Sequence, residues 1–130
     1  MILTIIESPF APINGHEGLT DDEYKSAISE NIAYAKFAMR DCLNKMEAPY
    51  ASHLLFTQDG LLDDRDPNQR RIGIEAGLIW GSKADQTAVY TDRGISKGMI
   101  QGIQRAKAEG RTIVYRSFPK GSESSVEIKK

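Results

Sequence analysis

QTAVYTDRGISKGMIQGIQRAKAEG, residues 86–110, contains the clearest indication of the fold in this chain. It begins with a short apolar run at residues 88–90, which is typical of a buried strand, and continues into a polar turn that contains glycine. Ser96 is a suitable N-cap for the helix that follows, because apolar residues then recur at helical spacing. Gly110 ends that helix. The stretch therefore predicts a strand, a turn and a helix.

The turn between this strand and this helix has the pattern Gly-x-Ser-x-Gly, and it is a candidate anion site. The first amides of a helix have no intrahelical partner, and the helix dipole makes this end positive, which suits a phosphate. The alternative is an ordinary turn in which the glycines only permit the bend. Arg93 and Lys97 are flexible cations beside it, and a solvated role is open for both. The candidate binding residues are Gly94, Ser96, Lys97, Gly98 and Met99.

The rest of the chain alternates between strand and helix patterns. The expected strands lie at residues 2–6, 50–57 and 112–115, and the expected helices at residues 20–46 and 68–81. This alternation predicts an α/β protein whose mainly parallel sheet, of four or five strands, carries helices on both faces. Residues 1–116 form the predicted domain, and residues 117–130 are predicted to be a polar, flexible tail.

Composition limits the classes of function. The chain has 130 residues and a formal net charge of −1, so it predicts one domain without the basic excess of a nucleic-acid-binding protein. Its single cysteine, Cys42, fits a reducing compartment. The apolar run at residues 1–6 is too short for a signal peptide or a membrane span. These features predict a cytoplasmic protein that does not bind a membrane.

The residues that follow the strands define the predicted mouth of a site, because ligands of parallel sheets bind beyond the carboxyl ends of the strands. Glu7 and Asp92 end two of these strands, and they are the candidate catalytic carboxylates. His53 is expected to be an ordinary strand residue. No Ser-His-Asp frame or metal-ligand spacing is readable, and the aspartates of residues 63–66 are expected to form a solvated loop rather than a cation site. No metal or cofactor is expected.

Several motifs, in order, resemble the nucleoside 2-deoxyribosyltransferase-like superfamily, which includes deoxynucleoside monophosphate N-glycosidases. The motifs are Ser8-Pro9-Phe10 after the first strand, Ala51-Ser52-His53-Leu54-Leu55, Leu61-Leu62-Asp63-Asp64, Arg70-Arg71-Ile72-Gly73-Ile74, and Ser96-Lys97-Gly98-Met99. The resemblance extends to Arg116. It implies a flavodoxin-like (Rossmann-like) three-layer sandwich, a nucleoside or nucleotide ligand, and a homodimer or larger assembly.

The resemblance also implies roles for particular residues. Ser96, Gly98 and Met99 would hold a 5′-phosphate, and Ser8, Pro9 and Phe10 would line the ribose and base. The catalytic nucleophile of these relatives is a glutamate on the last helix, and Gly102 occupies that position here. Because glycine has no side chain, no covalent intermediate can form at residue 102. Close helix–sheet packing and a widened pocket are the two explanations of this glycine.

Two functions follow as expectations. The first is a protein that binds a nucleotide or a nucleotide-derived molecule without the covalent glutamate, in a sequestering or sensing role. The alternative is an active N-glycosidase or deoxyribosyltransferase that uses Glu7 or Asp92. A purely structural or protein-interaction module is a third possibility.

Overall fold

The computed structural model of the protein describes residues 1–119, which form four strands and four helices. The strands are β1 (Ile2–Glu7), β2 (Glu47–Tyr50), β3 (Gln86–Tyr90) and β4 (Thr112–Arg116). The helices are α1 (Asp21–Asn44), α2 (Ser52–Leu55), α3 (Pro67–Gly81) and α4 (Lys97–Ala108).

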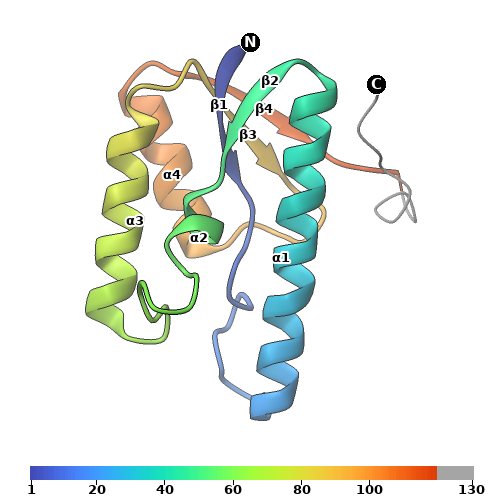
Figure 1. The fold of residues 1–130 in the computed structure, drawn as a ribbon, viewed down its shortest axis with the longest axis vertical. Helices are drawn as coiled ribbons and strands as arrows, with labels where there is room; N and C mark the ends of the chain where they lie inside the picture. The colour runs from blue at the N-terminus through green and yellow to red at the C-terminus, as the bar shows by residue number, and fades with distance from the viewer. Residues whose placement is uncertain (120–130) are drawn as a thin grey trace.

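The four strands form one parallel sheet in the order β2-β1-β3-β4. Helix α1 covers one face of this sheet, and α3 and α4 cover the other (Figure 1). The strand order reverses between β1 and β3, so a topological switch point lies where these two central strands end. The predicted α/β class and its flavodoxin-like three-layer arrangement are confirmed, with four strands in the sheet.

Side-chain caps fix the starts of the three long helices. Thr20 and Glu23 form a reciprocal capping box at α1, with bonds of 2.9 and 3.1 Å. Asp66 accepts hydrogen bonds from two amides at the start of α3, where Pro67 occupies the first turn. Ser96 Oγ accepts from the Met99 amide at 3.3 Å, as the sequence predicts for the N-cap of α4.

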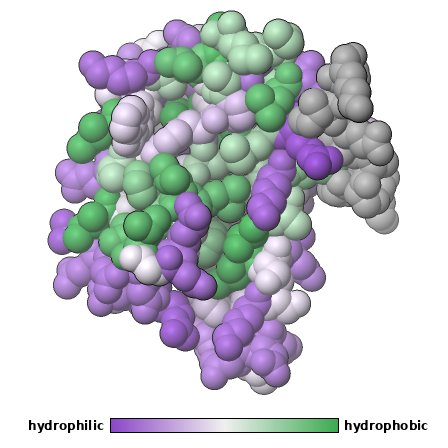
Figure 2. All heavy atoms as spheres, viewed as in Figure 1, coloured by the Kyte–Doolittle hydropathy of each residue, from purple (hydrophilic) through white to green (hydrophobic). Residues whose placement is uncertain are grey.

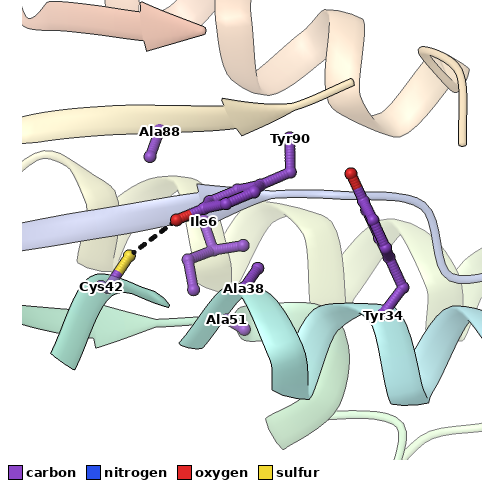
Figure 3. Packing of buried hydrophobic residues seen from close by; sticks show 7 residues of the cluster. All are labelled: Ile6, Tyr34, Ala38, Cys42, Ala51, Ala88 and Tyr90. Atoms are coloured by element: carbon purple, nitrogen blue, oxygen red, sulfur yellow. Dashed lines mark hydrogen bonds between the residues drawn. The ribbon is translucent and has the colours of Figure 1, made fainter. Parts of the chain in front are cut away.

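Each face of the sheet has its own hydrophobic core. On the α1 face, Tyr90 extends from β3 toward the helix, and its hydroxyl lies 3.3 Å from Cys42 Sγ (Figure 3). On the opposite face, Met99 and Ile103 of α4 pack against Val89. The alternation of side chains along β3 separates these two cores, since successive residues point to opposite faces.

The second strand begins earlier than predicted. Residues 50–57 were expected to form it, but β2 spans Glu47–Tyr50, and Ser52–Leu55 form the short helix α2. Pro49 belongs to the strand and pairs with Thr4. Because β2 is at the edge of the sheet, the missing amide of this proline leaves no central hydrogen bond unmade.

The predicted tail also needs a correction at its start. Phe118 packs edge-on against Phe37 with a ring-centroid distance of 4.2 Å and stacks on Tyr90 at 5.4 Å. Residues 117–119 therefore include a side chain that belongs to the core on the α1 face. The remainder of the predicted tail, residues 120–130, lies outside the described residues.

Polarity is distributed unevenly over the surface. On the face drawn in Figure 2, the end of the molecule where α1 begins carries mostly hydrophilic residues, whereas hydrophobic residues are spread over the middle and the opposite end. Met1, Ile2, Leu3 and Met46 are among the exposed hydrophobic residues. No helix within residues 1–119 is both long enough and apolar enough to cross a membrane.

Candidate functional site

A cleft of about 680 Å³ opens on the face of the sheet that carries α3 and α4. Its floor includes Ile5 and Glu7 of β1, and its walls come from α3, α4, the start of α2 and the loop of residues 10–17. Three glycines line it as well, namely Gly77 and Gly81 on α3 and Gly102 on α4. The cleft thus includes the carboxyl end of β1, beside the switch point.

One end of the cleft gathers groups of the kind that bind an anion. Ser96, Lys97 and Gly98 line it at the start of α4, and within residues 1–119 the amides of Lys97 and Gly98 have no hydrogen-bond partner. The Arg70 guanidinium reaches the same place from α3, because its Nη2 lies 3.8 Å from where a Cβ on Gly98 would be. Arg70 also donates to Asp64 Oδ2 at 2.8 Å, which holds the guanidinium in position. Two free amides, a helix dipole and a cation therefore converge.

Deeper in the cleft, the Glu7 carboxyl lies against Gly102. A Cβ added to Gly102 would be 2.5 Å from Glu7 Cδ and 2.8 Å from Oε1, with Oε2 closer still. The absence of a side chain at residue 102 is thus what gives the Glu7 carboxyl its place. Of the two explanations of this glycine, close packing is the one that the geometry supports, and the group packed against it is a carboxyl.

Glu7 is a neutral acid at pH 7 in this environment. Burial raises the pKa of its carboxyl from 4.5 to about 8, and the nearby positive charge of Arg111 only partly opposes this effect. Arg111 is itself held by Thr87 Oγ1 at 3.0 Å and by Glu109 Oε1 at 2.6 Å. Within residues 1–119, no hydrogen bond joins the Glu7 carboxyl to another residue. A neutral carboxylic acid can donate a hydrogen bond or a proton to a ligand in the cleft.

Ser8 and His53 form a second polar pair in the cleft. Ser8 Oγ lies 2.8 Å from His53 Nε2, and the direction of the hydrogen bond depends on the tautomer of the ring. Burial lowers the pKa of His53 to about 4, so the imidazole is neutral at pH 7. His53 was expected in a strand, but it lies in α2, and this position lets the ring reach the residue after β1.

The structure brings most of the predicted site residues to this cleft. Those that line it are Glu7, Ser8, Phe10, Ser96, Lys97, Gly98, Met99 and Gly102. Pro9, Asp92 and Gly94 are not among the lining residues. Gly94 has a φ of +87°, which glycine adopts readily and other residues rarely do, so this glycine is needed for the turn.

Asp92 contributes to packing on the other side of the sheet rather than to the cleft. Its Oδ2 accepts a hydrogen bond from Tyr34 Oη at 2.6 Å, and both carboxylate oxygens lie 3.1 Å from the amide of Phe118. These contacts join β3, α1 and the segment that follows β4. Of the two candidate catalytic carboxylates, only Glu7 reaches the cleft.

Sequence reasoning missed several residues of the cleft. Arg70, Asp64 and Arg111 line it but come from segments distant from the predicted mouth. The residues that follow the expected strand at residues 50–57 do not line it, because β2 ends at Tyr50 and α2 begins at Ser52. The sequence pointed to Arg70 only through the motif Arg70-Arg71-Ile72-Gly73-Ile74. Within residues 1–119, no group of three His, Cys, Asp or Glu side chains is arranged to hold a metal ion.

The fold and the cleft define a flavodoxin-like α/β protein with a polar cleft beside its switch point. Residues 3–116 match the model of a family described as a domain of unknown function (DUF7768), and the chain belongs to that family. The matched range ends at the last residue of β4. A search of curated proteins finds no match.

Proposed function

We propose that the cleft binds a phosphorylated nucleoside or another small molecule derived from a nucleotide. The observation that carries this proposal is the convergence of the Lys97 and Gly98 amides with the Arg70 guanidinium at one end of the cleft. A phosphate accepts several hydrogen bonds at once, and both the helix dipole and a guanidinium favour its charge.

The remainder of the cleft suits the uncharged part of such a ligand. Its volume of about 680 Å³ lies within the usual range for small-molecule sites. Phe10 offers an aromatic ring, and the Ser8–His53 pair offers polar groups for sugar hydroxyls or base edges. The resemblance to nucleoside 2-deoxyribosyltransferase-like proteins supports the same class of ligand.

Binding does not depend on the covalent chemistry of those relatives. Gly102 provides no nucleophile, whereas the groups that would hold phosphate lie at the other end of the cleft. Interactions that hold a ligand are separable from those that lower a chemical barrier. A sequestering or sensing role is compatible with this arrangement. The homo-oligomeric state and the cytoplasmic location stay predictions.

Isothermal titration with nucleoside 5′-monophosphates and the corresponding nucleosides tests the proposal. We expect saturable binding of at least one monophosphate, and affinity lower by at least tenfold for its nucleoside, since charge-assisted hydrogen bonds contribute about 1.5–3 kcal/mol each. ADP-ribose serves as a larger phosphorylated probe. Equal affinity for phosphorylated and unphosphorylated compounds, or no binding of any member of the panel, would contradict the proposal.

A further inference from the structure

We propose that the ligand of the cleft carries a diphosphate group, and that Tyr24 and Arg65 bind its second phosphate. This inference rests on the proposed function and narrows its ligand from a phosphorylated nucleoside to a nucleoside 5′-diphosphate. The observation behind it is a buried tyrosine that lines the cleft close to Arg70, and whose hydroxyl has no hydrogen-bond partner within residues 1–119.

Tyr24 is held firmly, but its hydroxyl is unpaired. The residue lies in the first turn of α1, and only 6% of its surface is exposed. Its ring packs on the ring of His16 at a centroid distance of 4.8 Å, and His16 Nε2 lies 2.8 Å from Asp21 Oδ1. Buried hydroxyl groups ordinarily have a hydrogen-bond partner. Because Tyr24 lines the cleft, a ligand bound there can supply the partner that residues 1–119 do not.

The hydroxyl of Tyr24 lies close to the end of the cleft where α4 begins. The charges of Asp64, Arg65 and Arg70 all act on it, and these three residues line the cleft as well. Arg70 Nη2 also lies 3.8 Å from where a Cβ on Gly98 would be. The two phosphates of a diphosphate share one oxygen, so the second must lie next to the first. With one phosphate at the start of α4, the other therefore meets the donors that surround Arg70.

The Tyr24 hydroxyl is a hydrogen-bond donor at neutral pH. Burial raises the pKa of this hydroxyl above its usual value of 10.0, and the negative charge of Asp64 adds to the effect. The hydroxyl therefore keeps its proton. Phosphate oxygens are strong acceptors, and a hydrogen bond to a charged acceptor is stronger than one between neutral groups.

Arg65 is the cation available to the second phosphate. Its Nε lies 3.8 Å from Asp63 Oδ1, which is too long for a hydrogen bond, and its side chain is 64% exposed. Arg70, in contrast, donates to Asp64 Oδ2 at 2.8 Å. The Arg65 guanidinium can therefore turn to a ligand without breaking a short bond, and a guanidinium binds phosphate through two parallel hydrogen bonds.

The charges that line the cleft favour a ligand with more than one negative charge. Four cations line it against two carboxylates, because Glu7 keeps its proton at pH 7. This local excess stands out in a chain whose formal net charge is −1. A diphosphate carries more negative charge than a monophosphate and so balances the excess better. The cations are Arg65, Arg70, Lys97 and Arg111, and the carboxylates are Asp64 and Glu17.

Isothermal titration with nucleoside 5′-monophosphates and 5′-diphosphates, paired by base, tests this inference. Wild type, Tyr24→Phe and Arg65→Gln are each titrated with both members of every pair. Phenylalanine keeps the ring that packs on His16 and removes only the hydroxyl, so the fold should be retained. Tyr115→Phe and Arg71→Gln are the matched controls, because both residues are exposed and neither lines the cleft.

In wild type and in both controls, we expect at least one diphosphate to bind at least about tenfold more tightly than the monophosphate of the same base. Tyr24→Phe and Arg65→Gln should each lower diphosphate affinity by about tenfold or more, and monophosphate affinity by no more than about threefold, because each removes a hydrogen bond to the second phosphate.

Three results would overturn this inference and leave the binding function standing. The first is a wild type that binds diphosphates no more tightly than monophosphates. The second is a loss in Tyr24→Phe or Arg65→Gln that is equal for the two ligands, or no loss at all. The third is an equal loss in the controls, which would indicate a general effect of charge. If no phosphorylated nucleoside binds, both the binding function and this inference fail.

Discussion

The Glu7 carboxyl occupies space that a side chain at Gly102 would need: Oε1 lies 2.8 Å from the position of a Cβ on that glycine. Glu7 ends β1, and Gly102 lies in the second turn of α4, so the relationship joins the sheet to the helix. A carboxyl from the strand thus takes the place of a side chain on the helix. This exchange accounts for a glycine in the middle of a helix, where alanine is ordinarily more favourable by about 1 kcal/mol.

Gly102→Ala should displace the Glu7 carboxyl without unfolding the protein. The atoms in the way belong to the far end of a flexible side chain, which can rotate. We expect the free energy of unfolding to stay within about 1 kcal/mol of wild type, because helix propensity offsets the displacement. Phosphate affinity should change little, because Lys97 and Gly98 lie at the other end of the cleft. Gln104→Ala, at an exposed position of α4, is the control. A loss of several kcal/mol in Gly102→Ala would mean that the Glu7 carboxyl cannot move out of the way.

The pKa of Glu7 predicts a specific dependence of stability on pH. In the unfolded chain this carboxyl ionises near 4.5, but in the folded protein near 8. Between these values the folded protein holds the extra proton, so the free energy of unfolding should fall as pH rises, by no more than about 1.4 kcal/mol per pH unit from this group. This contribution is fully present below pH 4.5 and is lost once pH exceeds 8.

Urea unfolding of wild type and Glu7→Gln at pH 5 to 9 measures this effect. Because glutamine does not titrate, the stability of Glu7→Gln relative to wild type should increase with pH across the window. Glu75→Gln should follow the wild-type curve. Parallel curves for wild type and Glu7→Gln would show that Glu7 is ionised in the folded protein at neutral pH.

Arg70→Gln should weaken the binding of phosphorylated ligands. The guanidinium lies beside Gly98 at the start of α4, and loss of a charge-assisted contact with phosphate should reduce affinity by about 10- to 100-fold. Arg71→Gln is a matched control, since Arg71 is the next residue of α3, is exposed and does not line the cleft. Titration with a monophosphate measures both. An equal loss of affinity in the two variants would indicate a general charge effect rather than a site.

Local sequence patterns were sufficient to predict much of this fold. The caps at Thr20 and Ser96 and the apolar run of β3 each carry a strong local preference, and the structure agrees with them. The second strand was misplaced because Glu47 and Pro49 do not look like strand residues. They are tolerated at the sheet edge, where Glu47 finds a partner, Arg116, that is 69 positions away.

The prediction of the site was limited in the same way: local patterns could be recognised in the sequence, but contacts between distant segments could not. Glu7, Ser96 and Gly98 were predictable because strand ends and helix starts are marked in the sequence, and parallel strands bring them to one edge. Arg70 reaches the cleft because of how α3 packs, and Arg111 reaches it from the position just before β4. No local sequence pattern predicts either placement. The protonation of Glu7 was equally hidden, since it arises from burial in the assembled cleft.

Glu47→Gln should strongly destabilise the protein without changing the cleft. Arg116 makes two hydrogen bonds to the Glu47 carboxylate, at 2.7 and 2.6 Å, and Gln86 donates a third at 2.7 Å. Both charged side chains are largely buried, so removal of one charge leaves the other without its partner, at a cost of about 3–5 kcal/mol.

Denaturant unfolding measures this loss, and Glu30→Gln provides the comparison. Glu30 pairs with Arg93 at 3.1 Å, but its side chain is 64% exposed, so the same chemical change there should cost less than about 1 kcal/mol. Similar losses in the two variants would mean that burial adds nothing to the Glu47–Arg116 pair.

Asp92→Asn tests whether the Asp92 carboxylate has a structural role or acts on the ligand. In the structure, Tyr34 Oη and the Phe118 amide both donate hydrogen bonds to the Asp92 carboxylate. Asparagine replaces one carboxylate oxygen with an NH2 group, which cannot accept a hydrogen bond from either donor. We expect a loss of about 1–3 kcal/mol in the free energy of unfolding. Monophosphate affinity should be unchanged, because Asp92 does not line the cleft. If the variant keeps its stability but loses monophosphate affinity, Asp92 acts on the ligand and is not a structural carboxylate.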